Sequence, residues 1–237
     1  MDSYCIKPSY LPNKINITND EVSNDNYWNS NRIRAAEIYQ FPVYKFLSQY
    51  ISKNNYRCVI DIGCGVSKKL EYLHKIHPKL EIIGIDQDEP IQYCKKNYNF
   101  GKWYSDDFED TKLSTHIKSK LIICSDVIEH LANPDLLLDY IKNKLENNGH
   151  AIISTPERDL LWGPNCNHSP NKYHVREWNS SELKNYLRKN GFEVLNHLVT
   201  FPVKMSLTKF FYKEILLKAL KFKTLKNNQM VIIKKKE

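Results

Sequence analysis

The chain has 237 residues, 41% of them hydrophobic, and a net charge of +8 from 35 lysines and arginines against 27 acidic residues. This length and apolar content are enough for one domain with a large core. The amino-terminal end does not read as a signal peptide, and no apolar run approaches the length of a membrane span. The six cysteines show neither a Cys-x-x-Cys pair nor zinc-ligand spacing, which indicates the reducing environment of the cytoplasm.

The positive charge is concentrated near the carboxyl-terminal end. Residues 204–237 hold ten lysines and two acids, which account for the whole excess. A basic surface attracts nucleic acid, anionic lipid or a phosphorylated substrate. Because the helix expected over 205–222 carries apolar residues on several faces, we interpret the lysines as a solvated surface and do not expect a nucleic-acid partner.

Short apolar runs alternate with helical patterns along the chain and predict an α/β fold with a doubly wound, mostly parallel sheet. The expected strands are 57–62, 81–86, 101–104, 120–125, 149–154, 192–200 and 229–234. The expected helices are 33–52, 67–77, 88–98, 134–147, 179–190 and 205–222. The last two strands are expected to form an antiparallel edge pair. Residues 1–31 are expected to be a flexible lead-in or lid, ahead of a single domain over 32–237.

A strand that runs into two closely spaced glycines is the first motif with a chemical meaning. Residues 59–65 read Val-Ile-Asp-Ile-Gly-Cys-Gly, and a second apolar run, 82–85, ends in Asp86. Such a turn lets backbone approach a ligand, and an acid on the next strand end accepts ribose hydroxyls. Lys68 replaces the third glycine of a dinucleotide motif, and Asp61 would repel a pyrophosphate. The pattern favours an adenosine ligand with a cationic amino acid group, and a nicotinamide-dependent oxidoreductase is the alternative.

Asp-x-Gly-x-Gly at this place resembles the first motif of class I S-adenosylmethionine-dependent methyltransferases. Further segments follow in the order of that family: Ser-Asp-Val-Ile-Glu-His-Leu at 125–131, Ile-Ser-Thr-Pro at 153–156 and His-Val-Arg-Glu-Trp at 174–178. The resemblance covers about residues 30–237. It implies a seven-stranded Rossmann-like sheet and S-adenosylmethionine as the cofactor.

The resemblance also implies which residues contact the cofactor. Asp107 is the first choice for binding the adenine amino group, with Asp106 as the fallback, and Phe108 packs on the ring. Ser125 and Asp126 lie beside the methionine portion. The full set implied is Asp61, Gly63, Cys64, Gly65, Asp86, Gln87, Asp107, Phe108, Ser125 and Asp126.

Methyl transfer to an alcohol needs positioning and a base for the alcohol proton, and histidine is the usual base near neutral pH. His130 follows the fourth strand, at the cofactor edge of the sheet. His168 and His174 lie in the long segment 155–178, which has the length of a functional loop. We favour His168 as the base, whereas His130 has an alternative structural reading and His174 an alternative role in orienting the loop.

The same loop region supplies candidate acceptor-binding residues. Arg158 and Arg176 are expected to clamp a phosphate or carboxylate, and Trp28 and Tyr173 to stack against a flat or sugar-like acceptor. A metal centre is not expected, because no third ligand is obvious beside Asp126 and Glu129.

The fourth-strand segment departs from the Asn-Pro-Pro-Tyr type of motif that accompanies nucleic-acid amino methylation in this fold. We therefore predict O-methylation of a polar small molecule, such as a sugar, nucleotide-sugar or surface-glycan precursor, in the cytoplasm. The alternatives are a quinone-like metabolite, RNA or protein as the acceptor, or a non-catalytic binding subunit that keeps the cofactor fold.

Overall fold

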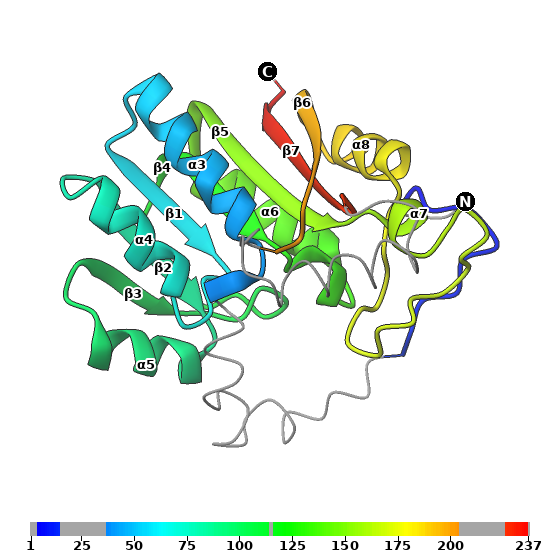
Figure 1. Cartoon of the computed structure of the whole chain (residues 1–237), viewed down its shortest axis with the longest axis horizontal. Helices are drawn as coiled ribbons and strands as arrows, with labels where there is room; N and C mark the ends of the chain where they lie inside the picture. The colour runs from blue at the N-terminus through cyan, green and yellow to red at the C-terminus, as the bar shows by residue number, and fades with distance from the viewer. Residues whose placement is uncertain (1–3, 15–36, 114–115, 204–225, 237) are drawn as a thin grey trace, which may run out of the picture.

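The computed structural model describes residues 4–14, 37–113, 116–203 and 226–236. One seven-stranded sheet runs through the molecule in the order β3-β2-β1-β4-β5-β7-β6 (Figure 1). Its strands are β1 (Cys58–Ile62), β2 (Glu81–Asp86), β3 (Gly101–Ser105), β4 (Ser119–Ser125), β5 (Leu145–Pro156), β6 (Phe192–Thr200) and β7 (Asn228–Lys235). The first five strands pair in parallel, whereas β7 pairs antiparallel with both β5 and β6.

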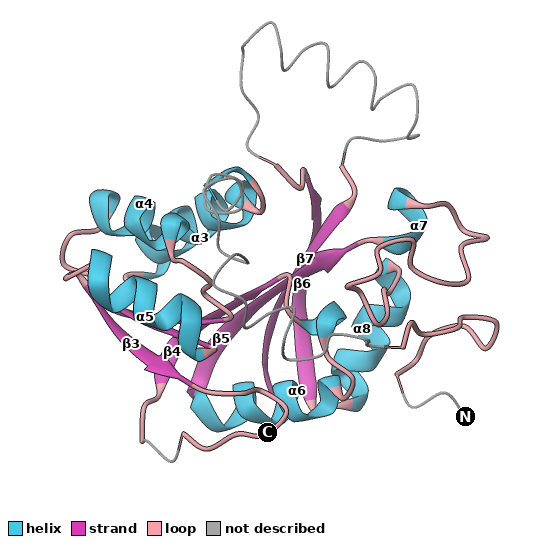
Figure 2. Cartoon of the chain, turned by 90° about the horizontal axis from the view of Figure 1, so that it is seen from below, coloured by secondary structure: helices cyan, strands magenta, loops and turns pink. Residues whose placement is uncertain are grey.

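Helices cover both faces of the sheet, as Figure 2 shows. On one face lie α3 (Phe41–Asn54), α4 (Lys68–Ile76) and α5 (Asp88–Asn97), and on the other lie α6 (Pro134–Lys144) and α8 (Ser180–Lys189). Two short helices, η1 (Ile128–His130) and α7 (Arg158–Leu161), follow the carboxyl ends of β4 and β5. This arrangement confirms the expected doubly wound, mostly parallel fold with an antiparallel pair at its edge.

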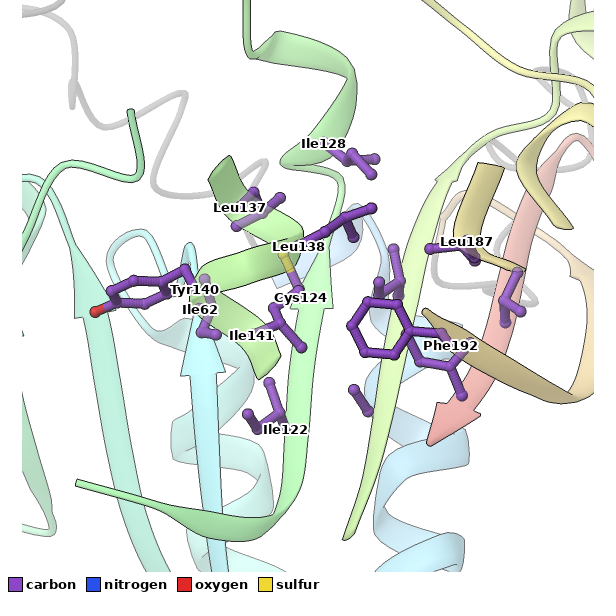
Figure 3. Close-up of a cluster of buried hydrophobic side chains, with 14 of the residues drawn as sticks. Ile62, Ile122, Cys124, Ile128, Leu137, Leu138, Tyr140, Ile141, Leu187 and Phe192 are labelled. Atoms are coloured by element: carbon purple, nitrogen blue, oxygen red, sulfur yellow. The ribbon is translucent and has the colours of Figure 1, made fainter. Parts of the chain in front are cut away.

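The sheet is buried on both faces, and each face has its own hydrophobic cluster. In Figure 3, Leu138 and Ile141 of α6 pack toward Ile122 and Cys124 of β4, and Phe192 extends the cluster toward α8. Because strands with two covered faces read as continuous apolar runs, the central strands were easy to place from the sequence. The core fixes the carboxyl ends of β1, β2 and β4 at one edge.

Three element boundaries differ from expectation for local reasons. The helix expected over 33–52 is interrupted in the described part: Glu37 and Ile38 are helical, Tyr39 and Gln40 are not, and α3 begins at Phe41. The interruption has a local reason, because the backbone of Gln40 is left-handed (φ 55°) and Pro42 stands in the first turn of α3. The helix expected to reach 147 ends at Lys144, and β5 begins at Leu145 with Asn148 (φ 58°) inside it. The helix expected over 205–222 lies outside the described residues. Among the described helices, none is long and apolar enough to cross a bilayer.

The amino-terminal stretch 4–14 packs along the loop that follows α7, and the two run side by side in both views (Figures 1 and 2). Ile6 and Tyr10 are buried in the core, and the Trp178 indole donates to the carbonyl of Tyr4 at 2.9 Å. Residues 4–14, which were expected to belong to a flexible lead-in or lid, are thus packed against the domain. Residues 1–3 and 15–31 of that expected lead-in lie outside the described residues.

Candidate active site

The glycine turn after β1 is bonded to the end of β2. The Gly63 amide donates to the Ile85 carbonyl at 2.8 Å, and the Gly65 amide donates to Asp86 Oδ2 at 2.7 Å. Gly63 has φ +81°, and a Cβ there would lie 2.2 Å from Val127 Cγ2. Only glycine fits, because the backbone is left-handed and the turn after β4 touches it. The ends of β1, β2 and β4 thus form one continuous edge.

Asp86 is oriented by two backbone donors. Besides the bond from Gly65, its Oδ1 accepts the Gln87 amide at 2.7 Å. A carboxylate has about four acceptor positions, so two amides still leave acceptor capacity at the strand end. The geometry suits the ribose-binding role proposed for Asp86, with Gln87 exposed beside it.

Asp61 is fully buried, and the Tyr44 hydroxyl of α3 donates to its Oδ2 at 2.7 Å. Burial raises the pKa of Asp61 to about 7, against the lowering effects of Tyr44 and the Lys69 ammonium. Lys69 lies 5.1 Å from the Tyr44 ring centre and feels the charges of Asp61, Asp86 and Asp126. The first-motif acid is thus balanced between its charged and neutral forms near physiological pH.

Asp126, which follows β4, joins three further elements at the same edge. Gln40 Nε2 donates to its Oδ2 at 2.8 Å, the Ser154 hydroxyl donates to its Oδ1 at 2.8 Å, and Asn228 Nδ2 reaches Oδ1 at 3.4 Å. Ser125 shares a 2.8 Å hydroxyl–hydroxyl bond with Ser154. The backbone of Asp126 is in the left-handed region (φ 54°), a conformation that residues with short polar side chains such as aspartate adopt more readily than most.

The predicted adenine contacts lie in the loop after β3. Asp106 is buried, and its Oδ1 accepts the amides of Asp107, Lys112 and Leu113, so this acid holds the loop. Asp107 is exposed and stays the proposed acceptor for the adenine amino group. Phe108 is buried against Tyr140, with ring centres 5.6 Å apart, and Cys64 is buried behind the glycine turn.

Two of the predicted histidines meet beside this edge. His130, at the end of η1, and His174, in the loop before α8, have ring centres 4.8 Å apart in an edge-to-face arrangement. Glu129 contributes a fully buried carboxyl group, and one ligand atom from each of the three residues lies within 4.8 Å of the others. We call Glu129, His130 and His174 the Glu-His-His cluster. It brings together groups separated by 44 residues of sequence.

The third candidate base, His168, lies outside this cluster. Its side chain is exposed, and its Nδ1 pairs with the neighbouring Asn167 Oδ1 at 3.0 Å. Within the described part of the chain, no buried partner orients this exposed imidazole as a base. The structure therefore favours His130 over His168, contrary to the order expected from the sequence.

The two arginines expected to clamp an acceptor are used inside the protein, which corrects that prediction. Arg158 is fully buried, with Nη1 and Nη2 donating to the two oxygens of Glu182 at 2.6 and 3.1 Å and Nε to Asp159 at 2.9 Å. Arg176 is buried and donates to the carbonyls of Leu131 and Ala132 at 2.9 and 3.0 Å. Both guanidinium groups hold loops together.

The remaining predicted acceptor contacts are not placed by side-chain geometry. Trp28 lies outside the described residues. Tyr173 is half-buried, and its backbone carbonyl lies 2.8 Å from His130 Nδ1. Stacking of these two aromatic rings on an acceptor stays a proposal.

Sequence patterns missed Tyr44, Gln40 and Glu177. The first two lie upstream of the first motif, and Tyr44 reads as part of an ordinary apolar stripe of a helix. Glu177 is fully buried and accepts bonds from Trp162, Ser169 and His174. Its spacing of three from His174 is the one signal that would have indicated a paired histidine.

We predict that Arg158→Ala lowers the free energy of unfolding by about 3–5 kcal/mol, because it leaves the buried Glu182 without its bidentate partner. Urea unfolding checks this, with Arg188→Ala, an exposed arginine of α8, as the control expected to change stability by less than about 0.5 kcal/mol. A raised KM for the acceptor with unchanged stability would instead restore the clamp role of Arg158.

The chain is similar to several known proteins. A family model described as a methyltransferase domain matches residues 30–197. A probable S-adenosylmethionine-dependent methyltransferase of Mycolicibacterium smegmatis is 26% identical over 200 residues, which are 82% of this chain and 70% of that protein. The tRNA U34 carboxymethyltransferase of Campylobacter jejuni is 29% identical over 178 residues, and the match spans 70% of this chain but 59% of that relative.

Among solved structures, the plantazolicin methyltransferase BamL in complex with a triazolic desmethylPZN analog and SAH has the same fold, with a TM-score of 0.60 and 19% identity over 83% of this chain and 84% of that one. The family model covers more than half of the chain. The chain therefore belongs to the methyltransferase family and uses S-adenosylmethionine as its methyl donor.

Proposed function

We propose that this methyltransferase methylates a hydroxyl group of a polar, uncharged small molecule, of which a sugar or glycan precursor is the leading class. The observation that carries the proposal is the Glu-His-His cluster beside the cofactor edge. Methyl transfer to oxygen requires that a proton leave the acceptor, and this cluster supplies groups that take or hold one.

The reaction balances without any further reagent. The acceptor oxygen attacks the methyl carbon of S-adenosylmethionine, the carbon–sulfur bond breaks, and S-adenosylhomocysteine leaves with the electron pair. The hydroxyl proton passes to a base and then to solvent. Because the displacement is in line, the protein's main task is to fix oxygen, methyl and sulfur in one row.

His130 has the right protonation state for that base. Its Nδ1 lies 2.8 Å from the Tyr173 carbonyl, which only accepts, so Nδ1 carries the hydrogen and Nε2 holds a lone pair. Burial, reinforced by the nearby His174, lowers the pKa of His130 to about 4. The imidazole is therefore neutral at physiological pH, and its Nε2 lone pair can accept a hydrogen bond from a bound hydroxyl.

The contacts of Arg158 and Arg176 bear on the charge of the acceptor. Arg158 and Arg176 were the residues expected to recognise a phosphate, and both are committed to internal partners. With neither arginine available for an anion, we place an acceptor recognised by hydroxyl contacts and aromatic stacking ahead of a phosphorylated one. We therefore narrow the proposal from a phosphorylated acceptor to an uncharged one.

RNA is the second candidate acceptor. It is favoured by the identity to the tRNA U34 carboxymethyltransferase of Campylobacter jejuni and by the lysines of residues 204–237. The basic stretch falls largely outside the described residues, and the match leaves 41% of that relative uncovered, by difference from the 59% that is covered. The small-molecule proposal therefore stands first.

The cofactor roles are proposed from the same edge. Asp61 faces the ammonium group of the methionine portion, and Asp86 accepts the ribose hydroxyls. Since the pKa of Asp61 without cofactor is about 7, the charged form that binds a cation is lost as pH falls below 7. Because cofactor binding requires the charged form, the affinity for the cofactor is expected to fall about tenfold as the pH is lowered from 8 to 6.

We predict that the Kd for S-adenosylmethionine, measured by calorimetry, rises about tenfold over this pH range in the unmodified protein. Asp61→Asn keeps the shape of the side chain, so it is expected to bind more weakly and with a flatter pH dependence. An equally steep pH dependence in Asp61→Asn would assign the titration to another group.

The acceptor class is tested by labelling. Purified protein and S-adenosylmethionine with a labelled methyl group are added to an extract of source cells, and the products are fractionated by size and class. We expect the label in small polar molecules or glycan, where it is present as a methyl ether. Label in RNA would establish the second candidate, and label in protein or a quinone fraction would contradict both.

We predict that His130→Ala lowers kcat by about a hundredfold or more, while the Kd for S-adenosylmethionine changes little, because the base acts on the acceptor. His168→Ala is the comparison, since its imidazole is exposed outside the cluster. A loss of turnover in His168→Ala with near-normal turnover in His130→Ala would return the role to His168.

A further inference from the structure

We infer that the Glu-His-His cluster is a binding site for a divalent transition-metal ion. The cluster offers two imidazole nitrogens and one carboxylate oxygen, all within 4.8 Å of one another. Tetrahedral ligands at about 2.0–2.1 Å from an ion are roughly 3.4 Å apart, so a shift of about an ångström closes the site. Sequence spacing did not indicate this, because the third ligand comes from a distant loop.

Both histidines are held in the tautomer that a metal ligand needs. His130 Nδ1 donates to the Tyr173 carbonyl, and His174 Nδ1 donates to the Glu177 carboxylate. Each ring therefore carries its hydrogen on Nδ1 and presents a lone pair on Nε2. At His174 that lone pair accepts the Asn171 amide at 2.9 Å, a half-buried contact that an ion would replace.

Glu129 supplies the second, independent observation. Its side chain is fully buried, and the Thr155 hydroxyl donates to Oε2 at 2.9 Å. The other oxygen, Oε1, finds no hydrogen-bond partner among the residues that the structure describes. A buried carboxylate oxygen without a partner costs free energy, and a cation within reach would offset that cost.

The surroundings are built as the outer shell of a metal site. Glu177, itself fully buried, also accepts the Ser169 hydroxyl at 2.8 Å and the Trp162 indole at 2.7 Å, so its contact with His174 is fixed. Carboxylate–histidine pairs of this kind orient metal ligands. From the amino-terminal stretch, Asn13 Nδ2 donates to the His174 carbonyl at 2.9 Å and holds the loop in place.

The donor set selects the kind of ion. Two imidazoles and one carboxylate suit Zn²⁺, Co²⁺ and Mn²⁺, whereas Mg²⁺ and Ca²⁺ prefer oxygen ligands alone. Three protein ligands leave at least one position open for another oxygen.

The site deepens the proposed function in one respect. An acceptor hydroxyl in the open position would lose its proton to solvent more readily, because the ion stabilises the alkoxide that attacks the methyl carbon. In that form His130 is a ligand, and its role as a base is confined to the ion-free protein. This role rests on the proposed function, but ion binding itself does not.

The test uses the full chain, stripped with a chelator and without acceptor or cofactor. Zn²⁺ binding is followed by calorimetry, and Co²⁺ binding by its visible absorption. We expect one ion per chain and at least a hundredfold weaker binding in Glu129→Gln and in His174→Ala. Glu177→Gln, which alters only the partner of a ligand, is expected to weaken binding about tenfold to a hundredfold.

His168→Ala is the matched control, because it removes an exposed imidazole from the same loop and is expected to bind the ion as the unmodified chain does. Circular dichroism and thermal unfolding establish that each variant is folded, and Glu129→Gln retains the oxygen that Thr155 contacts. The inference would be overturned if the unmodified chain bound no ion. It would also be overturned if Glu129→Gln and His174→Ala bound the ion as tightly as the unmodified chain does. If the chain binds the ion but the labelling experiment places no methyl group in small polar molecules or glycan, the proposed acceptor class is rejected and the metal site stands.

Discussion

Buried carboxylates are the constraint around which this molecule is organised. Asp61, Glu129 and Glu177 are all fully buried, and an ionised group in such a place is tolerated only with donors nearby. The donors come from distant parts of the chain: the Tyr44 hydroxyl of α3, the Thr155 hydroxyl of β5, and the side chains of Trp162, Ser169 and His174. Meeting these demands fixes a helix, a strand and a long loop against one edge of the sheet.

The loop between α7 and α8 gains its shape from polar contacts more than from apolar packing. Asn13 Nδ2 donates to the carbonyls of Ser169, Asn171 and His174, and Arg158 bridges α7 to Glu182 of α8. A long loop without regular structure would otherwise keep considerable conformational entropy. The amino-terminal stretch therefore helps to hold His174 beside His130 through a network of polar contacts.

This network also explains why charged residues near the site say little about the acceptor. Arginines in a functional loop suggest anion recognition, yet here the guanidinium groups serve backbone carbonyls and a buried glutamate. Among the described residues, the Glu-His-His cluster is the group that we propose for the chemistry. A neutral His130 and a metal-bound form are two states of one cluster, since the same Nε2 lone pair accepts a proton in one and coordinates an ion in the other.

Sequence patterns by themselves predicted the positions of the strands and the cofactor edge, and the resemblance of the motifs to a known family predicted the class of reaction. Buried parallel strands are continuous apolar runs, and the glycines of the first motif stand where the backbone is left-handed or touches Val127. These are local requirements, so local sequence reveals them. Only the tertiary structure decided that Arg158 is internal, that His168 is exposed and that His174 meets Glu129 and His130. Those outcomes depend on which donors satisfy which buried acids across more than 40 residues of chain, and no spacing rule encodes such pairings.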